Sequence, residues 1–100
     1  MQNIIVNLSN YGPVIIKKEI GEEILNSILE KKPRENPIEI DMSNIEAMTT
    51  LCAKLIFGHL YTSLGADLFN RNIRVVNKTK EIEMVINMGI QSAIEDSFDQ

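Results

Sequence analysis

The sequence predicts an α/β fold, a mixed four-stranded sheet with three helices packed against it, in the order β-β-α-β-α-β-α. Two observations lead to this prediction. Short runs rich in β-branched residues alternate with longer segments whose apolar residues recur every three or four positions. Glycine, proline and asparagine stand between these segments and mark the turns. Such alternation is typical of a sheet covered by helices, in which strands joined through a helix run parallel.

The first half of the chain contains two predicted strands, a helix and a third strand. Residues 3–8, NIIVNL, form the first strand, and residues 14–16, VII, form the second, which we expect to pair with the first as a hairpin. From Lys17 the apolar spacing becomes helical. The segment KKPRENP ends this helix, because each proline disfavours helical backbone in the residue before it. Residues 38–41, IEID, form the third strand.

The second half contains a helix, a strand and a closing helix. A helix is predicted over residues 50–64, with Gly65 as its C-terminal stop. The strand is centred on residues 74–76, RVV. The last helix begins near Thr79, whose hydroxyl can cap it, and acidic residues follow in its first turn. The acidic tail over residues 95–100 is expected to fray.

The composition limits the class of protein. One hundred residues predict a single domain over residues 1–100, and 44% hydrophobic with 24% charged residues is typical of a folded globular chain. A net charge of −4 argues against nucleic acid and anionic membranes as partners. Apolar runs of three or four residues are too short to span a membrane, and no signal peptide is evident. The lone Cys52 cannot form an internal disulfide, so we expect a cytoplasmic protein.

The helix over residues 50–64 has two different apolar sides. Its core stripe consists of Ala53, Ile56, Phe57, Leu60, Tyr61 and Leu64. Leu51 and Leu55 lie off this stripe, four residues apart, on the same side as Gly58. Either a neighbouring helix covers them, or they belong to a docking patch for another protein. In the second case Gly58 would let a partner backbone come close.

Few residues offer catalytic or metal-binding chemistry. The only histidine, His59, lies in mid-helix with no acid beside it to complete a hydrolase triad. One cysteine and one histidine cannot supply a zinc site, and no glycine-rich phosphate loop is present. We therefore expect no enzymatic activity, no metal and no cofactor. Cys52, in the first turn of a helix, is expected to be a small buried residue; a reactive thiol is the alternative.

Two adjacent hydroxyls, Thr49 and Thr50, stand where the helix begins. Either of them can accept a hydrogen bond from an unpaired N–H of the first turn. Alternatively one of them is phosphorylated, since a phosphate at a helix N-terminus meets free N–H groups and the favourable end of the helix dipole. The added charge would then lie beside Leu51 and Leu55.

From residue 38 to residue 90 the chain resembles the second half of a STAS domain. Such domains have a strand ending in an acid, a Ser/Thr at a helix start, a strand ending near Asn, and a closing helix that ends in a Gly-hydrophobic pair. The matching residues are Asp41, Thr49–Thr50, Val76–Asn77 and Gly89–Ile90. The first half, GPVIIKKEIGEEILNSILEK, is more similar to a divergent bacterial branch, the STAS-like domains of unassigned function. The resemblance covers about residues 12–95.

The resemblance implies a non-catalytic protein-interaction module. The best known STAS domains are anti-sigma-factor antagonists, which bind an ATP-using anti-sigma kinase and are released when a Ser or Thr at the helix start is phosphorylated. Thr50 takes that phosphoacceptor position. The family's usual Asp-Ser-Ser/Thr-Gly is Thr49-Thr50-Leu51-Cys52 here, without the acid and the glycine, which favours partner binding over a kinase switch. STAS-like domains often accompany histidine-kinase-type ATPases, which implies the same kind of partner.

Three hypotheses follow. The first is a cytoplasmic regulatory module that binds a protein partner of the histidine-kinase ATPase type through the loop over residues 42–50 and the helix after it. The expected contact residues are Ser43, Asn44, Thr49, Thr50, Leu51, Lys54, Leu55 and Gly58. The second is a small-ligand or nucleotide site formed by Asp41 and Asn77 at the carboxyl ends of two strands. The third is a homodimer formed through the same apolar side of the helix.

Overall fold

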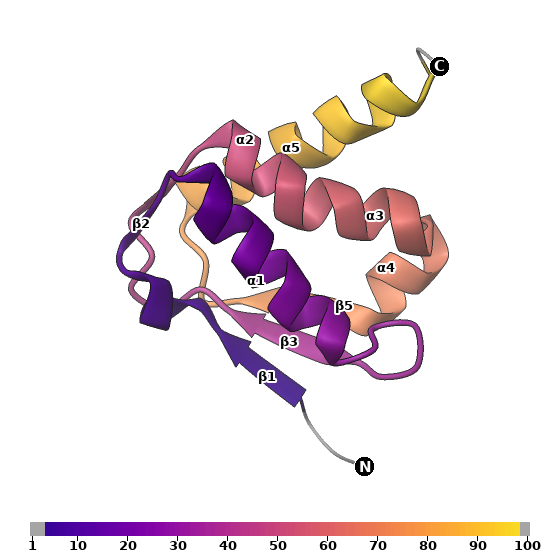
Figure 1. Cartoon of the computed structure of the whole chain (residues 1–100), viewed down its shortest axis with the longest axis horizontal. Helices are drawn as coiled ribbons and strands as arrows, with labels where there is room; N and C mark the ends of the chain where they lie inside the picture. Colours follow the sequence, from indigo (N-terminus) through magenta and orange to yellow (C-terminus); the bar gives the residue numbers. More distant parts are fainter. Residues whose placement is uncertain (1–3, 99–100) are drawn as a thin grey trace.

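Three parallel strands form the central sheet of the computed structural model, which describes residues 4–98 (Figure 1). These strands are β1 (Ile4–Asn7), β3 (Ile38–Asp41) and β5 (Ile73–Val76), in the spatial order β1-β3-β5. Both neighbouring pairs are parallel, as predicted for strands joined through helices. The predicted first strand began at Asn3, which lies outside the described residues.

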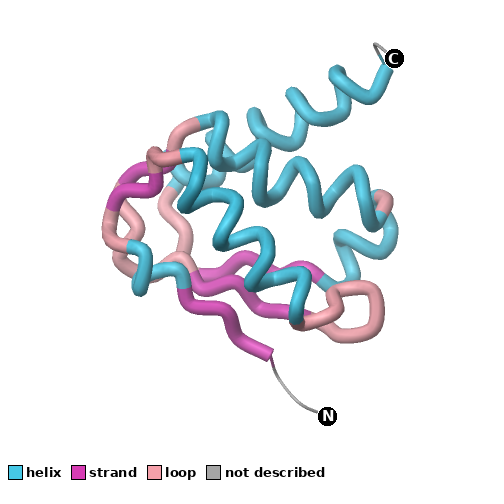
Figure 2. The backbone as a smooth tube through the Cα atoms, in the orientation of Figure 1, coloured by secondary structure: helices cyan, strands magenta, loops and turns pink. Residues whose placement is uncertain are grey.

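The strands present one apolar face and one polar face. Val6, Ile38 and Ile40 are buried on the side of the helices, because alternate side chains of a strand point to the same face. Glu39 and Arg74 lie opposite one another in the register and alternate with these buried positions. In Figure 2 the helices stand over one face of the sheet, so the fold is a two-layer arrangement within the described residues.

The second predicted strand pairs differently from the prediction. β2 (Val14–Ile15) does not form a hairpin with β1. It pairs in parallel with β4 (Ala47–Met48), a short strand that the sequence did not reveal. The predicted mixed four-stranded sheet is therefore wrong: the described residues form a three-stranded parallel sheet and a separate two-stranded parallel sheet.

A local hydrogen bond explains why the hairpin does not form. The side chain of Asn7 accepts a hydrogen bond from the Ser9 N–H at 2.9 Å, which winds η1 (Leu8–Tyr11) into a 3₁₀ turn instead of a hairpin turn. Leu8 is fully buried and anchors this turn. Gly12 then adopts φ 95°, a left-handed conformation that suits glycine, and the chain leaves the sheet.

Four helices cover the sheet within residues 4–98, one more than predicted. α1 (Lys18–Glu30) is the first. The second is one continuous helix, called the central helix here, made of α2 (Thr50–Ala53), the π-helical turn η2 (Lys54–Gly58) and α3 (His59–Leu64). It begins and ends as predicted, and Gly65 follows it with φ 86°. Of its predicted core stripe, Ala53, Ile56, Phe57 and Leu60 are buried, and Tyr61 and Leu64 are half-buried.

The additional helix is α4 (Ala66–Asn72), which starts directly after Gly65. Asp67 lies in its first turn and Arg71 in its last, which matches the helix dipole at both ends. It is held to α3 by an edge-to-face contact between Tyr61 and Phe69, whose ring centroids are 5.2 Å apart. This contact between residues eight positions apart stabilises a helix of only seven residues, which would be marginal alone.

The last helix, α5 (Lys80–Phe98), begins as predicted and ends later. The Thr79 hydroxyl accepts a hydrogen bond from the Ile82 N–H at 3.1 Å and so caps the first turn. The helix continues beyond Gly89–Ile90 and includes residues 95–98, which were expected to fray. An ion pair between Asp96 and Lys54 of the central helix holds this last part in place. None of the helices in residues 4–98 is long and apolar enough to cross a membrane.

α5 and the central helix cross at two glycines. A Cβ added to Gly89 would lie 2.6 Å from the backbone of Ala53 and of Lys54, and one added to Gly58 would lie 2.7 Å from the Ala93 Cβ. The two backbones therefore touch where both helices lack side chains. The π-helical turn, which covers residues 54–58, lies at this crossing.

Candidate functional site

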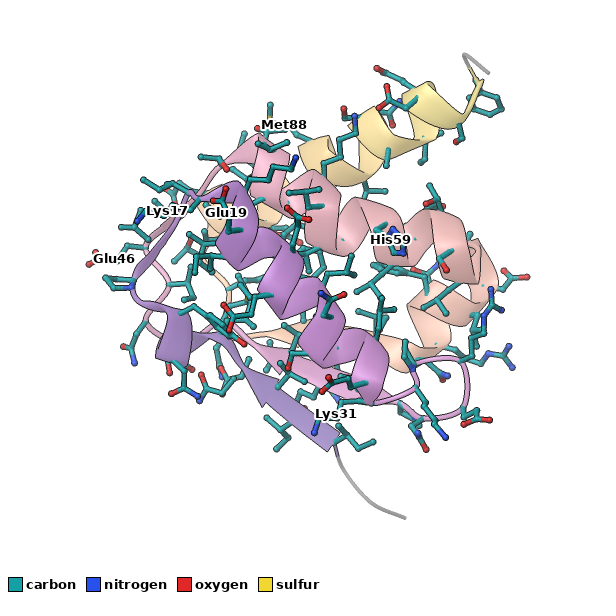
Figure 3. All side chains as sticks on the ribbon, in the orientation of Figure 1. Lys17, Glu19, Lys31, Glu46, His59 and Met88 are labelled. Carbon is teal, nitrogen blue, oxygen red and sulfur yellow. The ribbon has the colours of Figure 1, made fainter. Side chains whose placement is uncertain are left out.

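An open groove of about 450 Å³ runs along the central helix between α1 and the C-terminal half of α5. Its apolar lining consists of Leu25, Leu51, Leu55 and Ala93, and its polar lining of Glu22, Lys54, His59, Thr62 and Asp96. Figure 3 labels His59 on the outward side of the central helix, beside α1. We call this feature the α1–α5 groove.

The two leucines singled out in the sequence lie in this groove with different exposure. Leu51 is 51% exposed to solvent. Leu55 is half-buried beneath α1, where a Cβ built on Gly21 would lie 3.4 Å from the Leu55 Cδ1 atom. Both explanations given above therefore apply in part: α1 covers Leu55 incompletely and leaves Leu51 in solvent. Met88, on α5, is another exposed apolar side chain and lies near the α2 end of the central helix in Figure 3.

The start of the central helix assigns different roles to the two threonines. Thr49 is the N-cap, and its Oγ1 accepts a hydrogen bond from the Cys52 N–H at 3.2 Å. Thr50 is the first residue of the helix and is half-buried. The sequence left open which hydroxyl caps the helix, and the structure assigns this role to Thr49.

Cys52 is fully buried, as expected for a small residue on the core side. Its thiol donates a hydrogen bond to the main-chain carbonyl of Lys17 at 3.4 Å, which fastens the start of α1 to the central helix. A buried thiol with this partner is shielded from solutes, so the alternative of a reactive thiol is not favoured.

The loop over residues 42–49 is packed against the body of the protein. Its apolar residues Met42, Ile45 and Met48 are buried. The N–H groups of Glu46 and Ala47 donate to the Pro13 carbonyl, and the Thr49 N–H donates to the Ile15 carbonyl. Of the predicted contact residues in this loop, Asn44 is exposed with φ 66°, and Ser43 is half-buried. The exposed residues of the loop are Asn44, Glu46 and Ala47.

Asp41 and Asn77, from the ends of β3 and β5, lie together as the sequence predicted for carboxyl ends of neighbouring strands. The Asn77 side-chain amide donates to Asp41 Oδ1 at 3.0 Å. The same oxygen accepts hydrogen bonds from the Ser43 N–H at 2.9 Å and from the Ser43 hydroxyl at 2.6 Å. These bonds to Asn77 and Ser43 favour the carboxylate and lower the pKa of Asp41 below its ordinary value. They also join the ends of the two strands.

Two residues that were predicted to contact a partner make contacts with α5 of the same chain. Gly58 is buried, and the backbone that approaches it belongs to α5. The missing side chain of Gly58 thus serves the packing of the chain's own helices. Lys54 is paired with Asp96, although its side chain keeps 31% exposure in the groove.

Sequence reasoning missed the walls of the groove. Leu25 and Glu22 come from α1, and Ala93 and Asp96 come from α5, 71 and 74 residues after Glu22 along the chain. Leu25 follows the helical apolar spacing of α1, so no local signal distinguished it from the core residues. Within residues 4–98, no group of three or more His, Cys, Asp or Glu side chains is arranged to hold a metal ion.

Comparisons with known proteins place this fold in a family. The sequence profile of the STAS-like domain of unknown function (DUF4325) matches residues 20–83, well over half of the chain. The matched part runs from α1 to the first turn of α5 and includes the central helix. Neither a curated protein nor a solved structure matches the chain. The chain therefore belongs to the family of STAS-like domains of unknown function.

Proposed function

We propose that this chain is a non-catalytic regulatory module that binds another protein through the α1–α5 groove and the start of the central helix. The observation that carries the proposal is Leu51, a leucine 51% exposed in a groove with Leu25 and Leu55. Exposed apolar groups in a concave surface often mark a protein-binding site. The resemblance to STAS domains supports the same helix start as the docking point and a histidine-kinase-type ATPase as the partner.

The environment of the chemistry-bearing side chains supports a binding role. Asp41 is engaged by Asn77 and Ser43, and Cys52 is buried with its thiol on a main-chain carbonyl. Such groups hold the fold together and are poorly placed to act on a substrate. The groove, in contrast, offers apolar surface with a charged border, as protein interfaces do.

An aspartate at Leu51 tests this proposal. Leu51→Asp puts a charge into the groove without emptying the core, so the fold is retained while an apolar contact is lost. Ile5→Asp is the matched control, because Ile5 is similarly exposed, at 57%, but lies on β1, away from the groove. We expect proteins recovered by the wild type and by Ile5→Asp to be lost with Leu51→Asp. Equal recovery by all three folded proteins would contradict the proposal.

Thr50 is our candidate for a phosphorylated residue in this module. Thr49 already uses its hydroxyl as the helix cap, whereas Thr50 is the first residue of the helix, where an added phosphate meets the positive end of the dipole. Incubation with a candidate partner kinase and ATP, followed by mass spectrometry, tests this. Phosphate found on the wild type and absent from Thr50→Ala supports the assignment; phosphate retained in Thr50→Ala contradicts it.

A small-ligand site is the second candidate function. The observation that favours it is the meeting of Asp41 and Asn77 at the carboxyl end of a parallel sheet, where α/β proteins often bind ligands. A ligand at a hundredfold excess over its Kd raises the free energy of unfolding by about 2.7 kcal/mol. A thermal-shift series with nucleotides should then show a rise that Asp41→Asn removes. The absence of any shift would count against this candidate.

A further inference from the structure

The charge around the α1–α5 groove suggests what kind of partner fits it. The outward face of α1 has four exposed glutamates, Glu19, Glu22, Glu23 and Glu30. With Tyr11 of η1 they line a second open surface hollow of about 540 Å³. Glu22 lines both this hollow and the groove, so the acidic face of α1 continues into the groove wall.

The opposite wall, formed by α5, has two exposed acids, one of which is paired with a lysine. Asp96 lies there with 60% of its side chain exposed, and the neighbouring Glu95 is exposed as well. Lys54, the lysine of the groove lining, is paired with Asp96 and does not offset the charge of Glu22. The leucines of the floor thus lie beside the acidic face of α1, whereas on the α5 side Asp96 is paired with Lys54 and Glu95 is the further exposed acid.

The dimensions of the floor suit a helix. From Leu51 to Thr62 the central helix advances eleven residues, or about 17 Å at 1.5 Å per residue, which is about three turns of a partner helix. Apolar residues of the partner spaced four apart would lie along Leu51 and Leu55, themselves four apart. Binding of an amphipathic helix in an apolar groove is a common mode of recognition.

We propose that the groove binds a cationic amphipathic helix of the partner, with lysine or arginine along the flank that faces Glu22 and the acidic face of α1. This inference rests on the proposed function and specifies its partner. Charges of opposite sign across an interface raise the association rate and exclude wrong partners. A second copy of the chain is disfavoured as the occupant, because its net charge of −4 has the same sign as the acidic face of α1. Lys17, the residue before α1, lies near the Leu51 end of the groove and is itself basic. The basic residues of the partner are therefore expected farther along the groove, beside Glu22.

Two synthetic peptides of eighteen residues test the inference with the full chain. Both peptides have leucines spaced four apart on one helical face; one has lysines on both flanks and the other has glutamates. Titration of the ¹⁵N-labelled chain, followed by NMR, gives the affinity and the amides that shift. We expect the lysine peptide to shift groove amides around Leu51 and Leu55, and to bind at least about tenfold more tightly than the glutamate peptide in low salt.

Protein variants locate the effect. Glu22→Gln should weaken binding of the lysine peptide about threefold, whereas Glu35→Gln, in the loop after α1, should leave it unchanged. Leu51→Asp should remove the groove shifts. Equal affinity of both peptides in the groove would overturn the charge assignment while the proposed docking function stands. Binding of the lysine peptide that survives Leu51→Asp, or that shifts only the outer face of α1, would overturn the inference, because the contact would then be electrostatic only.

Discussion

Replacing Gly89 by alanine tests whether the crossing of α5 and the central helix determines stability. A Cβ at this position would lie 2.6 Å from the carbonyl carbon of Ala53, 2.6 Å from the Lys54 nitrogen and 2.8 Å from the Ala53 Cβ. Two of these atoms belong to the backbone and cannot rotate away. The two helices must therefore move apart, which loosens the packing beneath the groove.

The size of the effect is the difference of two contributions. Overpacking a well-packed site costs about 1–3 kcal/mol, and a clash with backbone belongs at the upper end of this range. Alanine gains about 1 kcal/mol over glycine in a helix interior. We therefore expect Gly89→Ala to lower the free energy of unfolding by about 2 kcal/mol. For a domain of this size that corresponds to a fall in Tm of about 8–16 °C.

Gly21→Ala is the matched control for the same chemical change. Gly21 is also a buried helix residue, but its added Cβ would meet Cys52 Sγ and Leu55 Cδ1 at 3.4 Å, which is ordinary contact. This variant should be as stable as the wild type or more stable by up to about 1 kcal/mol. Urea unfolding and thermal melts followed by circular dichroism measure both. If Gly89→Ala matched or exceeded the wild type in stability, the reasoning on the crossing would be refuted.

Three further predictions concern the start of the central helix and the end of β3. Thr49→Ala should lower the free energy of unfolding by about 1 kcal/mol in a urea titration because it removes the N-cap, whereas Thr50→Ala should change it little; equal losses would contradict the assignment of the cap. Because the pKa of Asp41 is lowered in the folded protein by its hydrogen bonds from Asn77 and Ser43, its contribution to stability is present above the ordinary value of 3.8 and is lost as the pH falls through the folded pKa. The stability difference between the wild type and Asp41→Asn should accordingly shrink in acid, and a difference that stays constant down to about pH 2 would contradict the reasoning. The thiol of Cys52 should react with a chromogenic disulfide reagent only after unfolding, and rapid reaction in native buffer would show that the site is accessible.

The sequence predicts only part of the candidate site. The off-stripe positions of Leu51 and Leu55 follow from helical periodicity alone, and the structure places both in the groove. The adjacency of Asp41 and Asn77 follows from the parallel order of the strands. The close backbone approach expected at Gly58 comes from α5 of the same chain, since a helical wheel shows which residues share a side but not which neighbouring helix covers it. The walls of the groove come from two helices that are distant in sequence, and no local pattern connects them.

The sequence by itself determined the elements whose signals are local: the strand over residues 38–41, the central helix with its stop at Gly65, and the capped start of α5. Apolar periodicity, caps and glycine positions act within a few residues, so they can be read along the chain. Only the tertiary structure decided that β2 pairs with β4, that α4 forms against Tyr61, and that two glycines bring α5 onto the central helix. These contacts join residues far apart in sequence or too few to be stable alone, and their free energy exists only when the chain is packed.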